Sequence, residues 1–148
     1  MIKDISCCSY FEAVDRTWLA ELLHPERDGI DLPYSIAHAT LLPGAASLPH
    51  RLRKSSEVYI ILEGEGLMHI ESDVQAIHAG QTVLIPPGSW QHLQNTGEKA
   101  MKFLCIVHPF WRAGDEEVIS SSQQPEVADS SKQSEASGEQ TAAANLIR

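Results

Sequence analysis

A histidine and a glutamate with the potential for chemistry lie close together in the segment HRLRKSSEVYIILEGEG, residues 50–66. His50 opens the segment, and Glu57 begins a β-branched, apolar run that is typical of a buried strand. An ionised carboxylate is costly to desolvate unless it is paired, hydrogen-bonded or bound to a metal ion. Glu57 therefore needs a partner that the rest of the chain must supply.

Two further side chains are candidates for the same site. Tyr59 follows Glu57 by two residues, so a pleated strand places both on one inward face, where the phenol would orient a substrate or fill the interior. In SWQHLQNTG, residues 89–97, the same alternation groups Gln91 with Leu93 and turns His92 to the opposite face. Gln91 is thus a candidate partner for Glu57, as a ligand or as a structural hydrogen bond.

The elements that would carry these residues are short β-prone runs separated by Gly, Pro and Asn. The runs are YSIAHATLL, EVYIILEGEGLMHI, QTVLIPPG, SWQHLQNTG and KAMKFLCIVHP. Turn signals recur after every run, which predicts an all-β sandwich or barrel. His38, in the first run, either faces the cavity of this barrel or is an ordinary half-buried histidine.

The N-terminal region has a different pattern. In DRTWLAELLHPERDG, Asp15 is a possible N-cap and the Trp and Leu residues that follow have helical spacing, with Pro25 and Gly29 as stop signals. This predicts a short helix near residues 15–23, within an N-terminal extension of residues 1–29.

The C-terminal region is rich in Ser, Gln, Glu and Ala and has little to bury. Such a segment cannot offset the entropy lost on ordering it. We therefore expect a barrel domain over residues 30–113 and a disordered acidic tail over residues 114–148.

Composition narrows the function classes. The 148 residues, 43% of them hydrophobic, suit one domain, and the net charge of -9 offers no basic face for a nucleic acid. The sequence contains no apolar run of membrane-spanning length and no signal-peptide pattern. Three cysteines without a CxxC spacing favour neither a disulfide framework nor a structural zinc site, so we expect a cytoplasmic protein.

Two sets of residues at fixed offsets resemble the motifs of the cupin superfamily. The first motif is matched by Gly44, His50, Glu57 and Gly64, with Leu52 in place of the second histidine.

The second motif is matched by Gly80, Pro86, Gly88 and Asn95, with Gln91 in place of the histidine. The resemblance covers about residues 34–110, and this part of the chain is similar to small, single-domain cupins. It implies a double-stranded β-helix, that is, a conical β-barrel or jelly roll of two antiparallel sheets around a central cavity.

The resemblance also implies a ligand set and an assembly. His50, Glu57 and Gln91 would hold one divalent ion (Zn, Fe, Mn or Ni), and Leu52, His38 and Leu93 would line a substrate pocket. The alternative is a His50 that is hydrogen-bonded to Glu57 without any metal. Family membership, together with the apolar stretches SYF and HPFWR, also favours a homodimer.

Three functions follow as hypotheses. The first is a metal-dependent enzyme on a small molecule, of isomerase, epimerase, dioxygenase or lyase type, in which Glu57 or Tyr59 moves a proton. The second is a metal-free module that binds a sugar or an organic acid, and the third is an accessory protein acting through its acidic tail. The basic loop of Arg51, Arg53 and Lys54 is either solvated charge or a lip that attracts anions.

Overall fold

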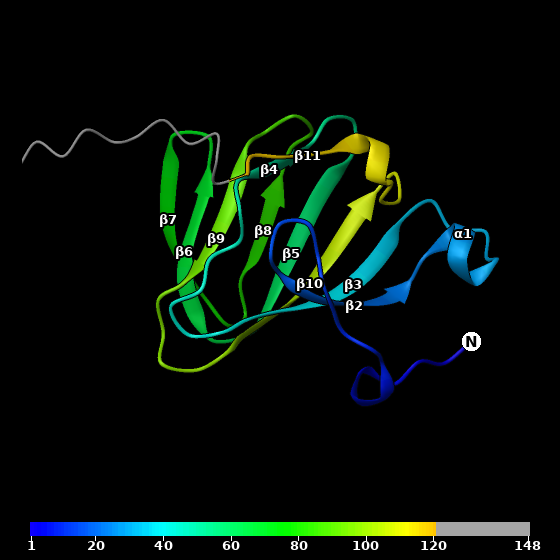
Figure 1. Ribbon diagram of the computed structural model, residues 1–148, viewed down its shortest axis with the longest axis horizontal. Coiled ribbons are helices and arrows are strands. Elements are labelled where there is room, and N and C mark those ends of the chain that lie inside the picture. The colour runs from blue at the N-terminus through cyan, green and yellow to red at the C-terminus, as the bar shows by residue number, and fades with distance from the viewer. Residues whose placement is uncertain (121–148) are drawn as a thin grey trace, which may run out of the picture.

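Two antiparallel β-sheets face each other in the computed structural model, which describes residues 1–120 (Figure 1). The six-stranded sheet has the order β1 (Phe11–Glu12), β2 (Trp18–Leu23), β3 (Ser35–Leu41), β10 (Met101–His108), β5 (Ser56–Glu63) and β8 (Thr82–Ile85). The five-stranded sheet has the order β11 (Glu116–Val118), β4 (His50–Leu52), β9 (Gln91–Asn95), β6 (Glu65–Ile70) and β7 (Asp73–His78). The all-β, cupin-like architecture predicted from the sequence is confirmed.

The core lies between the two sheets and follows from strand alternation. In β10, Met101, Phe103, Cys105 and Val107 are buried while the residues between them are half-buried. The neighbouring strands β3 and β5 add buried Leu41 and Ile61, and the facing sheet adds Met68 and Leu93, among others. This apolar core occupies one part of the interior and leaves the part near His50 polar.

The prediction of a helix near residues 15–23 is wrong. Residues Trp18–Leu23 form β2, which pairs with β3, and the only α-helix of the described residues is α1, Pro25–Asp28. A helix of so few residues is marginal alone, whereas the edge of β3 offers a complete hydrogen-bonding ladder. Asp15 does accept a hydrogen bond from a backbone N–H, that of Thr17, but it closes a turn before a strand.

The predicted boundaries of the barrel also need correction. Strands β1 and β2 belong to the six-stranded sheet, so residues 11–23 are part of the barrel. At the other end, a 3-10 helix, η2 (Ala113–Asp115), leads into β11, which pairs with β4. The predicted tail thus starts too early at 114, and its residues 121–148 lie outside the described part of the chain.

The C-terminal strand is held by polar contacts that composition could not show. The Asp115 carboxylate accepts hydrogen bonds from the backbone N–H groups of Lys54 and Ser55, at 2.9 and 3.0 Å. Glu117 forms ion pairs with Arg51 and Arg53. No helix among residues 1–120 is long and apolar enough to cross a membrane.

Candidate functional site

Three strands bring His50, Glu57 and Gln91 together in the barrel interior. His50 in β4 is directly opposite Gln91 in β9. The Gln91 amide donates a hydrogen bond of 2.5 Å to Glu57 Oε2. Because β5 and β9 belong to different sheets, this bond crosses the interior, and all three side chains are buried.

Burial gives Glu57 an unusual protonation state. Desolvation raises its pKa from 4.5 to about 7, against the lowering effects of the His50 charge and of the hydrogen bond from Gln91. The negative charges of Asp15 and Glu116 raise it further. Near neutral pH, Glu57 is therefore present in both its acid and its carboxylate form.

His50 is oriented by groups on its Nδ1 side. Nδ1 lies 2.8 Å from the carbonyl oxygen of Leu48, to which it donates when protonated, and 3.7 Å from Asp15 Oδ2. Burial lowers the pKa of His50, but the charges of Asp15 and Glu57 outweigh it, so the pKa is raised overall. With Nδ1 used in this way, Nε2 is the ring nitrogen left for a ligand.

A cavity of about 180 Å³ adjoins this pair. Its lining includes Asp15, His50, Leu52, Glu57, Tyr59 and Glu116. Tyr59 lies on the inward face with Glu57, as alternation predicted, and its ring packs on Phe103 with the centroids 4.9 Å apart. Burial, followed by the Glu57 charge, raises the pKa of Tyr59 well above its usual value, so the phenol stays a proton donor.

Four carboxylates of the cavity, those of Glu12, Asp15, Glu21 and Glu116, were not predicted from the sequence, and Asp15 and Glu116 are the two that act on Glu57. Asp15 comes from the turn between β1 and β2, and its backbone carbonyl accepts a hydrogen bond from Leu48 N at 2.7 Å. Glu116 comes from β11, and its Oε2 accepts a hydrogen bond from Trp111 Nε1 at 3.2 Å. Burial raises the pKa of Glu116. Both lie outside the two motifs, so no spacing signal pointed to them.

The remaining predicted residues are divided between the cavity and other places. Leu52 lines the cavity as predicted. His38 does not: it lies on the other face of β3, where its Nδ1 is 2.7 Å from the Tyr10 hydroxyl. Leu93 is part of the apolar core and does not line the cavity either. His38 is thus a buried histidine outside the cavity and not a half-buried one. Strand alternation placed Leu93 inward without telling core from cavity.

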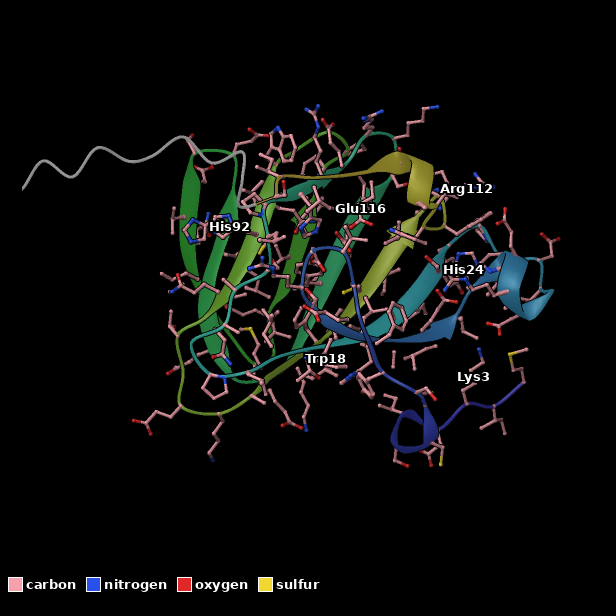
Figure 2. The ribbon with its side chains drawn as sticks, viewed as in Figure 1. Lys3, Trp18, His24, His92, Arg112 and Glu116 are labelled. Carbon is pink, nitrogen blue, oxygen red and sulfur yellow. The ribbon has the colours of Figure 1, made fainter. Side chains whose placement is uncertain are left out.

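The outward residues near the site have partners of their own. His92, labelled in Figure 2, stacks on His69 with ring centroids 3.9 Å apart and is not part of the cavity lining, in agreement with the prediction that it faces away. Arg51 and Arg53 pair with Glu117 and do not line the cavity. The basic loop is therefore not part of the cavity lining.

The donor set does not fit the divalent ion implied by the sequence resemblance. Within residues 1–120, no three side chains of His, Cys, Asp and Glu are grouped so that they could hold a metal ion. Gln91 turns its NH₂ group, not its oxygen, toward Glu57, and Leu52 offers no donor atom. Protein sites for such ions commonly use three or four ligands. The groups available for chemistry at this site are therefore its own acids and bases.

Comparison with known proteins agrees with the family that the two sequence motifs indicate. Residues 37–107 match the family described as cupin domain. An uncharacterized protein of Methanocaldococcus jannaschii is 34% identical over 106 residues, which are 71% of this chain and 83% of that protein. The oxalate-binding protein of Thermotoga maritima is 31% identical over 71 residues, 48% of this chain and 59% of that protein.

Solved structures share the fold. The crystal structure of a protein described as a predicted oxalate decarboxylase, also from Thermotoga maritima, has a TM-score of 0.66 at 24% identity, covering 73% of this chain and 98% of that chain. The structure of Pac13, a nucleoside dehydratase, has a TM-score of 0.65 at 18% identity, covering 84% and 98%. At these identities the likeness concerns the fold alone.

Proposed function

This chain belongs to the cupin superfamily, and from that premise we propose that its barrel cavity binds a small organic molecule beside His50 and Glu57. The observation that carries the proposal is a cavity of about 180 Å³ that adjoins a buried carboxyl group with a pKa of about 7. Perturbed titratable groups in a concave, largely apolar pocket are typical of binding and catalytic sites. A cavity of about 150 Å³ can hold a benzene-sized molecule, so the ligand is of about one-ring size.

His50 and Glu57 are suited to exchange a proton with this ligand. A group with a pKa near the working pH is half-protonated, so it can both give and accept a proton. Glu57 has this property, and the Nε2 atom of His50 is the second acid or base. Tyr59 is a permanent donor that orients the ligand. Isomerisation, epimerisation and elimination need only such transfers, whereas binding without turnover uses the same groups as hydrogen-bond partners.

Ligand screening tests the binding proposal. A thermal-shift screen of small sugars, alcohols, amines and acids, followed by calorimetric titration of each hit, is expected to yield a ligand. We expect His50→Gln and Glu57→Gln each to weaken its binding at least about tenfold, since a buried polar contact is lost. His92→Gln changes the same residue type on the outer face and is expected to bind normally. Equal affinity in all variants would place the ligand elsewhere and contradict the proposal.

The same preparation tests the alternative that the site holds a metal ion, which the resemblance to the two motifs implies. Elemental analysis of the protein as purified is expected to find Zn, Fe, Mn and Ni below stoichiometric amounts, because the donor set is incomplete. A stoichiometric ion that is lost in His50→Ala would instead support a metal-dependent site. Incubating each hit with the protein and analysing for product separates an enzyme from a binding module.

A further inference from the structure

We propose that the cavity accepts uncharged or positively charged molecules that present N–H or O–H donors, and that it excludes carboxylates and phosphates. This inference rests on the proposed function, because it names the ligand class of the same cavity. It comes from charged groups that neither motif contains.

The side chains around the cavity are strongly unbalanced in charge. Five carboxylates line it, those of Glu12, Asp15, Glu21, Glu57 and Glu116. Among residues 1–120, the basic side chains of the lining are only His50 and Arg27. Arg27 forms a salt bridge of 2.5 Å with Glu21, so its charge is already compensated.

The carboxylates nearest the site act on each other. Asp15 and Glu116 lie on different segments of the chain, and the charge of each raises the pKa of Glu57. An incoming carboxylate or phosphate would meet the same repulsion, in an interior where charges are weakly screened. An ammonium group, a hydroxyl or an amide N–H would instead donate to these carboxylates, which can accept a further hydrogen bond beside those from Thr17 and Trp111. A dicarboxylate such as oxalate is therefore a poor ligand for this cavity.

The apolar part of the cavity surface determines the apolar part of the ligand. Leu52, Phe103 and Val107 are buried apolar residues of the lining. A ligand that fits has an apolar face toward these residues and donors toward Glu57 and Glu116. Polar groups that fix orientation within a mostly apolar pocket are the usual arrangement of small-molecule sites.

Cys105 allows this preference to be measured without knowing the ligand. It lines the cavity, and Cys7 and Cys8, the other two cysteines of the sequence, can be replaced with serine. Its thiolate attacks a methanethiosulfonate reagent, forming a mixed disulfide and releasing methanesulfinate. The reagents are 2-aminoethyl (cationic), methyl (neutral) and 2-sulfonatoethyl (anionic) methanethiosulfonate. The rate at which each reagent modifies Cys105 is divided by the rate at which it modifies 2-mercaptoethanol in solution, which gives a normalised rate.

We expect the normalised rate of the cationic reagent to exceed that of the anionic one by about tenfold or more at low salt, with a smaller ratio at high salt. The double variant Asp15→Asn, Glu116→Gln is expected to lower this ratio at least about threefold, because two charges of the cavity are removed. Glu98→Gln removes one charge from an exposed turn and is expected to leave the ratio unchanged. Taking a ratio cancels changes in thiol reactivity that are common to all reagents.

Three results would overturn the inference: equal normalised rates, a faster anionic reagent, or no reaction with the neutral reagent, since the cavity would then admit no solute. None of these depends on the ligand screen with His50→Gln and Glu57→Gln. A cavity that favours cations but binds no ligand would contradict the proposed function and leave this inference standing.

Discussion

Glu57 is the residue on which the chemistry of this barrel depends. Among residues 1–120, its hydrogen-bond partner is a neutral amide, that of Gln91, so burial is opposed by one hydrogen bond and by the charge of His50. Neither suffices to keep the carboxyl group at its usual pKa. The carboxylate that the sequence marked as needing a partner is thus only partly satisfied, which keeps its proton exchangeable.

This state of Glu57 has a direct effect on stability. A carboxyl group whose pKa is raised from 4.5 to about 7 on folding binds more protons in the folded than in the unfolded chain between these values. Its contribution to the free energy of unfolding therefore falls as pH rises through this window, by at most about 3 kcal/mol, and levels off above it. The raised pKa of His50 adds a loss of the same sign at higher pH.

We therefore expect Glu57→Gln to be more stable than the native chain at about pH 8 and to gain less, or nothing, at about pH 5. Urea unfolding of both proteins at the two pH values measures this difference. Glu98→Gln, an exposed change of the same kind, is the control and should show the native pH dependence. A difference between Glu57→Gln and the native chain that is independent of pH would contradict the pKa assignment.

Leu52 is the second residue that sets the character of the site. Leu52→His would place an imidazole beside His50 and Glu57, and we expect it to create a Zn²⁺ site with an affinity in the micromolar range or better. Without zinc, the variant should lose about 2 kcal/mol of stability, because a polar group replaces a buried apolar one. Calorimetric titration with zinc measures the affinity, and urea unfolding without zinc measures the loss of stability.

The control for this change is Leu62→His, at a leucine that is 42% exposed. It should bind zinc no better than the native chain. Equal zinc binding by both variants would show that Leu52 is not a missing ligand position.

At the level of elements, the sequence predicted the strands that carry the motifs. Alternation in β5 and β9 was sufficient because a pleated strand fixes which neighbours share a face, and so Glu57, Tyr59 and Gln91 were placed correctly. Alternation failed for β2, where the apolar residues fit the helical repeat as well as the strand repeat. Pairing with β3 made this segment a strand.

Composition failed at the C-terminal end for a related reason. Strand β11 has three residues, and it is held by backbone pairing and by ion pairs of Glu117. Such contacts are formed by polar residues that composition assigns to solvent. Asp15 and Glu116 were missed because their place in the cavity depends on where these two terminal segments pair with the sheet edges.

Truncation tests the role of β11. A chain ending at residue 114 loses the Asp115 and Glu117 contacts as well as the strand, and we expect its melting temperature to fall by at least about 5 °C relative to a chain ending at residue 120. Calorimetry measures both chains. Equal melting temperatures would show that β11 adds nothing to the barrel.

The contact between β6 and β9 leaves no room for a side chain at Gly66. A Cβ there would lie 2.1 Å from the carbonyl oxygen of Gln94, a backbone atom of the neighbouring strand. We expect Gly66→Ala to cost about 3 kcal/mol of unfolding free energy, because β9 and its Gln91 must shift. Gly114→Ala meets no atom within 4 Å and is the matched control, expected to change stability little. Urea unfolding that finds equal stabilities would contradict this packing.

For the whole molecule, the predicted homodimer stays a prediction. Phe110 and Trp111 of the apolar HPFWR stretch are engaged within the chain, by His24 and Glu116. Phe11, Val14 and Trp18 remain exposed by 45%, 70% and 46% in and between β1 and β2. We expect light scattering to give twice the chain mass of 16.3 kDa, and Trp18→Ser to shift the protein toward the single-chain mass. A native protein that is monomeric at high concentration would contradict it.

The placement of Asp15 and Glu116 at opposite ends of the described chain has a consequence for how such barrels diversify. The strands that carry His50, Glu57 and Gln91 are fixed by packing and pairing, while two of the charges beside them are supplied by a turn and a three-residue edge strand. Exchanging these two short segments can change the charge of the cavity and leave every motif residue in place. Two chains with identical motifs can therefore differ in the charge of the ligands they accept, and substrate names should be transferred between them by comparing the terminal segments first.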